Sequence, residues 1–258
     1  MRIVVLIKEV PDTYGPRMLD LETGLAARSA SARVPDEVGE RALECALRYA
    51  EQNAGTEVIA LTMGPQLAAG TIRKALAMGA ARGIHVCDDG LVGADLTLTA
   101  QVLAAAITRV GFDLVIAGNL STDGAGGVIP AMLAELLDAP ALTALTTLEI
   151  QADRISCMRQ SEGETQEVSA ALPAIASVTE SLPDPRLPGF KGIMAAKKKS
   201  IETISLPDLG LDPEDPSAPR SVVLAVAERP TRSAGTKIVD EGDAGRQLAD
   251  YLIGNRLV

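Results

Sequence analysis

The feature of the sequence best suited to chemistry is a glycine-rich loop between an apolar run and a helical pattern. The stretch AGNLSTDGAGGVIPAML covers residues 117–133 and follows the apolar run 114–117. Consecutive backbone N–H groups ahead of a helix can bind a phosphate. The loop has one acid, Asp123, and no base, so it lacks the lysine of a phosphoryl-transfer loop. It is predicted to hold a phosphate without transferring it, and a tight corner without a ligand remains the alternative.

Few other side chains are suited to catalysis. His85 is the only histidine and has no recognisable orienting partner, so a structural role is expected. Cys45, Cys87 and Cys157 are far apart and form no CxxC pair, which predicts free thiols in a reducing compartment. Asp123 could fix its own loop by accepting hydrogen bonds from backbone amides, or it could accept one from a ribose hydroxyl. We therefore expect neither catalytic residues nor a metal site.

Composition narrows the class of protein. The chain has 258 residues and a net charge of −10, which argues against binding to nucleic acid or to an anionic membrane surface. Apolar runs are interrupted well before the roughly 20 residues that a membrane helix needs, and the N-terminus does not resemble a signal peptide. We expect a cytoplasmic globular protein whose core is built from Ala, Val, Leu and Ile.

Strands and helices alternate over the first half of the chain. Strands are predicted at 2–10, 57–63, 83–88 and 114–117, with helices at 36–54, 71–78, 96–110 and 128–137. This alternation predicts an α/β fold with a doubly wound, mostly parallel sheet. If the strand order is third, second, first, fourth, the segments that follow the first and fourth strands flank one crevice at the carboxyl edge of the sheet.

The second half of the chain has a different pattern of residues. Short strands and turns after residue 143 predict an antiparallel extension of the sheet. We place the main domain at 1–205, with a loop at 182–192, and an extended arm with a short helix, 244–253, at 206–258. The arm contains Pro207, Pro213, Pro216, Pro219 and Pro230. It either embraces another subunit or wraps around its own domain.

One loop could contact a partner protein. Phe190, one of two phenylalanines, lies in a segment rich in proline and glycine, next to the basic run 197–199. An exposed aromatic residue beside lysines could anchor a partner. Alternatively, Phe190 pins its own loop and the lysines are a solvated helix end.

Taken together, these passages resemble the β subunits of electron transfer flavoproteins almost from end to end. The resemblance rests on LIKEVPDT, TIRKALAMGAARGIHV, GNLSTDGAGGVIPAMLAELL, RQSEGETQEVSAALPAIASV, PRLPGFKGIMAAKKKSIE and RSAGTKIVDEG. It implies an adenine-nucleotide α-hydrolase-like fold in an αβ heterodimer. FAD would be held mostly by the α subunit, and AMP, or in bifurcating relatives a second FAD, would lie in this chain.

The resemblance also implies which residues act. The nucleotide contacts would be Leu6, Asp36, Glu37, Val38, Gly39, Met63, Gly118, Asn119, Ser121, Thr122, Asp123, Gly124, Ala125, Gly126, Gly127, Val128 and Ile129. The partner-recognition loop would be 182–199, with docking residues Phe190, Lys191, Ile193 and Met194. Departures from relatives are Leu120 at a usually polar position, Cys157 and Ala176 in the hairpin, and Thr13 with Tyr14.

The function that the resemblance implies is electron transport. Single electrons would pass from flavin dehydrogenases, such as acyl-CoA dehydrogenases of fatty acid oxidation, to a membrane quinone oxidoreductase. This chain would carry no catalytic residue. A rival enzyme, a nucleotide α-hydrolase or adenylating synthetase, would need a Ser-Gly-Gly loop after the first strand, where this chain has KEVPDT. A stand-alone ATP- or AMP-binding module is the other alternative, although such modules lack a long arm.

Overall fold

The computed structural model describes residues 1–258 except 16, 29, 216, 217, 219 and 233, so Pro216 and Pro219 of the expected arm lie outside the described residues. The chain divides into two units, Met1–Leu224 and Ala225–Val258. The second unit contains helix α7 (Ala244–Gly254), in agreement with the expected C-terminal helix. Residues 206–224 of the expected arm belong to the first unit.

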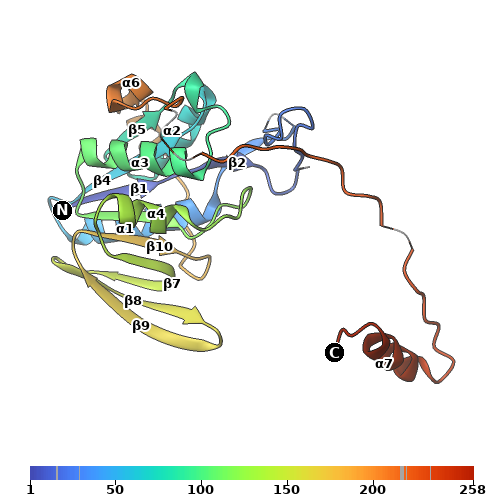
Figure 1. Ribbon diagram of the computed structural model, residues 1–258. Coiled ribbons are helices and arrows are strands. Elements are labelled where there is room, and N and C mark those ends of the chain that lie inside the picture. Colours follow the sequence, from blue (N-terminus) through green and yellow to red (C-terminus); the bar gives the residue numbers. More distant parts are fainter. Residues whose placement is uncertain (16, 29, 216–217, 219, 233) are drawn as a thin grey trace. The chain divides into compact units, whose positions relative to one another are not determined.

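The first unit is built on a nine-stranded sheet (Figure 1). All neighbouring pairs are parallel as far as β7, and the pairs β7–β8 and β8–β9 are antiparallel. The predicted antiparallel extension is therefore confirmed, and the first four predicted strands have the order that was considered for them. In spatial order the strands are β11 (Ile201–Ile204), β5 (Arg82–Val86), β4 (Glu57–Met63), β1 (Arg2–Leu6), β6 (Leu114–Gly118), β10 (Ala174–Val178), β7 (Ala141–Ile150), β8 (Arg154–Ser161) and β9 (Glu164–Ala171).

Helices cover both faces of this sheet. α1 (Glu37–Gln52) and α2 (Ala69–Met78) pack into one core cluster, and α3 (Leu96–Val110) and α4 (Ile129–Leu136) pack into a second. Parallel strands require such crossover helices, and the two clusters are the two sides of a doubly wound sheet. In the described part of the chain, no helix is both long enough and apolar enough to cross a membrane.

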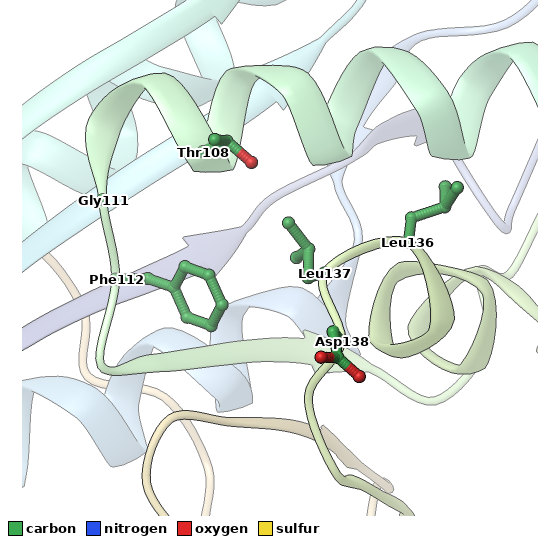
Figure 2. Close-up of a pocket in the computed structure, with 6 residues that line it drawn as sticks. All are labelled: Thr108, Gly111, Phe112, Leu136, Leu137 and Asp138. Atoms are coloured by element: carbon green, nitrogen blue, oxygen red, sulfur yellow. The ribbon is translucent and has the colours of Figure 1, made fainter.

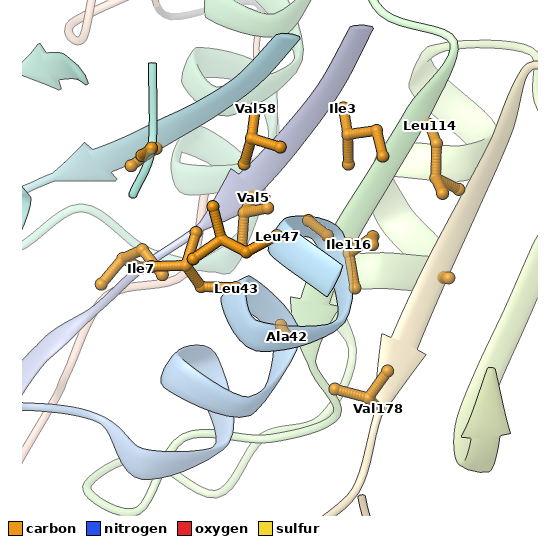
Figure 3. Packing of buried hydrophobic residues seen from close by; sticks show 14 of the residues in the cluster. Ile3, Val5, Ile7, Ala42, Leu43, Leu47, Val58, Leu114, Ile116 and Val178 are labelled. Carbon is orange, nitrogen blue, oxygen red and sulfur yellow. The ribbon is translucent and has the colours of Figure 1, made fainter. Parts of the chain in front are cut away.

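Side-chain alternation in β1 assigns its residues to the two cores. Ile3 and Val5 point to the α1 side, where Leu43 and Leu47 meet them, whereas Val4 belongs to the α3 side (Figure 3). All three β1 residues are fully buried, as expected for a central strand covered on both faces.

Four local expectations were wrong. The predicted strand 2–10 ends at Leu6, and β2 (Glu9–Pro11) leaves the sheet to pair with β3 (Arg33–Pro35). The predicted loop 182–192 gives way at its end to helix α5 (Phe190–Ala196), which packs on α2. No strand was predicted at β11, which pairs with β5. In the predicted irregular arm, α6 (Leu206–Leu209) forms, and Pro207 lies in its first turn, where proline is tolerated.

Close packing of β5 against α2 yields a first prediction. A Cβ on Gly83 would lie 2.2 Å from Cγ2 of Ile72, so Gly83→Ala should lower the free energy of unfolding by about 1–3 kcal/mol. Ile72→Leu removes the methyl group from Cβ and should recover part of that loss in the double variant. Urea unfolding of the two single variants and the double variant measures this. Strictly additive effects would contradict the predicted contact.

Candidate functional site

The segments that were expected to flank a crevice meet where α1 begins beside the ends of β1 and β6. A Cβ on Gly39 would lie 3.4 Å from the Leu6 carbonyl oxygen. A Cβ on Gly118 would lie 3.1 Å from Cγ1 of Val38. Two glycines thus allow the helix and both strand ends to approach closely. Four residues that were predicted to contact a nucleotide are brought together at the carboxyl edge of the sheet.

Asp36 ties the helix to both neighbouring segments. Its backbone N–H donates to the Lys8 carbonyl oxygen at 2.8 Å, and its carboxylate Oδ2 accepts from the Thr122 amide at 2.8 Å. The Thr122 hydroxyl lies 3.4 Å from the same oxygen. Asp36 is only 3% exposed, so this residue joins the end of β1, the start of α1 and the glycine loop inside the protein.

The second carboxylate oxygen of Asp36 is unusual. Oδ1 is buried and has no hydrogen-bond partner among the described residues. Burial raises the pKa of Asp36 above its ordinary value, although the hydrogen bond from the Thr122 amide opposes the rise. An unpaired buried acceptor is costly, and a donor group on a ligand would relieve that cost. The hydroxyl and amino groups of a nucleotide are donors of this kind.

The glycine loop, residues 119–128, leaves backbone donors free. The Ala125 amide donates to the Ser121 carbonyl oxygen at 2.8 Å and closes a turn, with Ala125 at φ 49° and Gly127 at φ 67°. The amides of Gly126, Gly127 and Val128 have no partner among the described residues, and they directly precede α4. Free N–H groups ahead of a helix fit an anion, so the loop fits the phosphate expected there.

Asp123 fixes the loop. Its Oδ1 lies 2.7 Å from Lys8 Nζ and accepts from the Gly124 amide at 2.7 Å, while Oδ2 lies 2.7 Å from Arg28 Nη1. Burial would raise the pKa of Asp123, but hydrogen bonds from Lys8, Ser121 and Arg28 hold it well below its usual range. Both oxygens have partners, which favours the loop-fixing role over contact with a ribose.

Sequence reasoning missed the positive charges at this site. Lys8 and Arg28 pair with Asp123, and Arg17 donates to the Thr122 carbonyl oxygen. The three basic residues lie about a hundred residues before the loop, so no local motif contains them. The only sequence signal was the position of Lys8 just after β1, at the edge that the glycine loop also occupies. Together they make a net acidic chain locally basic where an anion is expected.

The remaining residues that were predicted to contact a nucleotide lie in several different elements. Met63 ends β4, on the same edge as Leu6 and Gly118. Asn119 joins the loop to β10 through its amide, which donates to the Val178 carbonyl oxygen at 2.8 Å. Ile129 begins α4. Glu37 differs, because its carboxylate lies 2.7 Å from Arg41 Nη2 and is engaged there.

The predicted docking residues form an exposed surface on α5. Phe190 is 79% exposed, and Lys191, Ile193 and Met194 are exposed as well. Leu187, just before the helix, is 88% exposed and was not predicted. Four large apolar side chains thus face solvent within eight residues of chain.

His85 and Cys157 are placed as expected for a structural histidine and a free thiol. His85 is buried in β5, with Nε2 3.0 Å from the Gly64 carbonyl oxygen. Cys157 is buried, and burial raises the pKa of its thiol to about 11, so it remains an unreactive thiol.

Two open hollows lie elsewhere on the surface. One, of about 450 Å³, is lined by Thr108, Phe112, Leu136, Leu137 and neighbours (Figure 2). A second, of about 410 Å³, shares Thr108 and Leu136 with it. Phe112 precedes β6, so the first hollow lies at the amino end of that strand. Ligands of such sheets bind at the carboxyl ends, where the glycine loop lies.

Asp36 generates a prediction about stability and pH. Asp36→Asn should raise the free energy of unfolding at pH 7 by about 1–2 kcal/mol, because it removes a buried charge and can keep the bond from Thr122. The pKa of Asp36 is raised on folding, so the native state takes up its proton first. The advantage of the variant should therefore shrink as the pH falls from 7 towards the ordinary aspartate value.

Urea unfolding between pH 7 and pH 4 measures this difference. Asp123→Asn is the matched control on the same loop and should destabilise at pH 7, because it leaves Lys8 and Arg28 without their partner. A pH-independent gap between Asp36→Asn and the unsubstituted protein would contradict the account.

Comparison with known proteins gives a consistent result. The family described as "Electron transfer flavoprotein domain" matches residues 23–209. The chain is 43% identical to the electron transfer flavoprotein subunit beta of Mycobacterium leprae, over 99% of each chain. It is 34% identical to the corresponding subunit of Bacillus subtilis, over 98% of this chain and 97% of the relative. It is also 35% identical to the caffeyl-CoA reductase-Etf complex subunit CarD of Acetobacterium woodii, over 83% of this chain and 82% of the relative.

The sequence motifs, the doubly wound sheet and these full-length similarities agree with one another. The chain belongs to the electron transfer flavoprotein family, as a beta subunit.

Proposed function

We propose that this chain is the β subunit of a cytoplasmic αβ electron transfer flavoprotein with AMP bound in the crevice at Asp36 and the glycine loop. The heterodimer shuttles single electrons from flavin dehydrogenases, such as acyl-CoA dehydrogenases, to a membrane quinone oxidoreductase. FAD, held mostly by the α subunit, supplies the redox chemistry. The observation that carries the proposal is the set of free amides at Gly126 to Val128 close to the unpaired acceptor Asp36 Oδ1.

The residues of this chain bind and position rather than react. Free amides and nearby basic side chains suit the phosphate, and Asp36 Oδ1 suits a donor group of the nucleotide. Asp123 holds the loop through Lys8 and Arg28, which rigidifies the crevice. In this assignment the nucleotide stabilises the fold, because anything that binds only the native state does so.

The exposed surface on α5 is assigned to dehydrogenase docking. Phe190, Ile193 and Met194 provide apolar contact area, and residues 187–199 include four lysines and no acid. A partner with an apolar socket bordered by acidic groups would complement this surface. The second unit is assigned to the α subunit, since α7 exposes Leu248 and Ile253 and has no buried residue.

Two alternative functions differ from this proposal in the nucleotide or the partner that they require. A bifurcating complex would carry a second FAD in place of AMP, and the similarity to a subunit of a caffeyl-CoA reductase-Etf complex motivates this alternative. A stand-alone ATP- or AMP-binding module would need no partner. Its apolar exposure on α5 and α7 would then have no explanation.

Nucleotide content distinguishes these alternatives. We expect that co-expression with the neighbouring α-subunit gene, purification and denaturation release one FAD and one AMP per heterodimer. Two FAD would favour the bifurcating complex and contradict the AMP assignment. A chain that purifies alone, without flavin and without a stable partner, would contradict the carrier function altogether.

Phe190 gives a prediction about docking. Phe190→Ala in the heterodimer should raise the KM of a reduced acyl-CoA dehydrogenase for the heterodimer by about tenfold or more and leave kcat nearly unchanged. The control is Leu136→Ala, which removes an exposed apolar side chain from α4. Equal KM values for Phe190→Ala and the unsubstituted heterodimer would remove Phe190 from the docking surface.

A further inference from the structure

The exposed apolar surface on and before α5 is fastened to the rest of the protein at both ends. We call the contacts before it the α1 clamp and the contacts after it the α2 clamp. Arg186 makes the main contact of the α1 clamp, and Arg73 and Lys199 form the α2 clamp. Leu187, Phe190, Ile193 and Met194 lie between the two clamps and are all exposed.

The α1 clamp is an ion-pair network centred on the buried carboxylate of Glu44. Arg186 Nε lies 2.7 Å from Glu44 Oε2, its Nη2 lies 3.2 Å from Glu44 Oε1, and its backbone N–H donates to Glu44 at 3.1 Å. Arg186 also pairs with Glu51, about two turns further along α1. Glu44 is 3% exposed and accepts from Arg48 at 2.6 Å as well.

Charge at Glu44 depends on these contacts. Burial would raise the pKa of Glu44, yet the bonds from Arg186 and Arg48 hold it below its ordinary value. Arg41 of the same helix adds to the clamp, since it lies 2.6 Å from Asp184 Oδ1 and donates to the Leu182 carbonyl oxygen. The segment that leads into α5 is therefore fixed along the side of α1.

The α2 clamp joins two helix ends reciprocally. Arg73 of α2 donates to the carbonyl oxygens of Ala196 at 2.6 Å and Lys199 at 2.9 Å, at the end of α5. Lys199 Nζ donates to the carbonyl oxygens of Ala80 at 2.5 Å and Leu76 at 3.4 Å, at the end of α2. Each helix ends with carbonyl groups that lack partners within the helix, and each receives a cation from the other.

Close backbone contact completes the attachment of α5. A Cβ on Gly192 would lie 2.2 Å from the Ala77 carbonyl oxygen, so α5 packs on α2 as closely as glycine allows. Burial lowers the pKa of Lys199, in keeping with an ammonium group enclosed between the two helices. Ordering a flexible segment on binding costs affinity, whereas a segment fixed beforehand avoids that cost.

We propose that Arg186 and Arg73 are positioning residues that pre-organise the apolar surface Leu187, Phe190, Ile193 and Met194 for docking. Neither arginine needs to touch the partner, because each acts by holding α5 and its lead-in segment in place. This inference rests on the proposed docking function. It adds that the affinity for the dehydrogenase depends on residues outside the exposed surface itself.

The test uses the αβ heterodimer, with an acyl-CoA dehydrogenase from the same genome, reduced by its acyl-CoA substrate, as the docking probe. Arg73→Ala and Arg186→Ala are compared with Arg73→Lys and Arg186→Lys. Arg154→Ala is the matched control, since Arg154 is an exposed β8 arginine whose side chain bonds only to Ser169 among the described residues. Hydrogen–deuterium exchange of the 187–199 amides and the KM and kcat of electron transfer are measured for each.

We expect both alanine variants to speed up exchange at 187–199 and to raise KM about fivefold, with kcat and flavin content unchanged. Arg73→Lys should keep more affinity than Arg73→Ala, because a single guanidinium nitrogen of Arg73 makes both of its bonds to α5 and Lys199. Arg186→Lys should recover less, since several guanidinium nitrogens bind Glu44 and Glu51. Arg154→Ala should change neither exchange nor KM.

Three results would overturn the inference. Exchange could stay unchanged in the alanine variants, or it could accelerate while KM stays the same. KM could also rise together with a loss of flavin or kcat, which would indicate general damage to the heterodimer. If Phe190→Ala has no effect on KM either, the docking function itself fails. If KM rises for Phe190→Ala but not for the arginine variants, only the positioning role of Arg73 and Arg186 is rejected.

Discussion

The positions of the glycine loop and of the segment before α5 depend most on the close packing of α1 against the ends of β1 and β6. Gly39 and Gly118 permit this packing. This packing buries Asp36 at the start of the helix, where it holds the glycine loop through Thr122. About two turns further along the same helix, Glu44 holds the segment before α5 through Arg186. One helix therefore holds the glycine loop at one end and the segment that precedes α5 along its side.

Buried carboxylates do most of this fixing, and they respond to pH in opposite directions. The pKa values of Asp123 and Glu44 are lowered by basic partners, so their stabilising contribution is present above the ordinary carboxylate pKa and is lost as the pH falls below it. The pKa of Asp36 is raised by burial, so its charge costs stability at neutral pH and that cost declines on acidification. A site with such a cost is suited to binding a ligand whose donor group relieves it.

Periodicity in the sequence was enough to predict the α/β class and the helices α1 to α4, because apolar residues repeat there at regular intervals. The glycine loop was recognisable for the same local reason. Very short elements, and contacts between residues far apart in the sequence, could not be predicted. β11 has four residues and α5 seven, too few to establish a period. The partners Lys8 and Asp123 are separated by 115 residues, and Arg186 and Glu44 by 142, so only the folded chain brings them together.

The proposed function assigns the nucleotide in this chain to assembly and not to electron transfer. The most direct measurement is refolding of the denatured heterodimer with FAD, in the presence and absence of AMP, followed by the yield of heterodimer and the turnover per assembled flavin. The account predicts that AMP raises the yield and leaves turnover per flavin unchanged. An equal yield without AMP, or a turnover per flavin that depends on AMP, would contradict it.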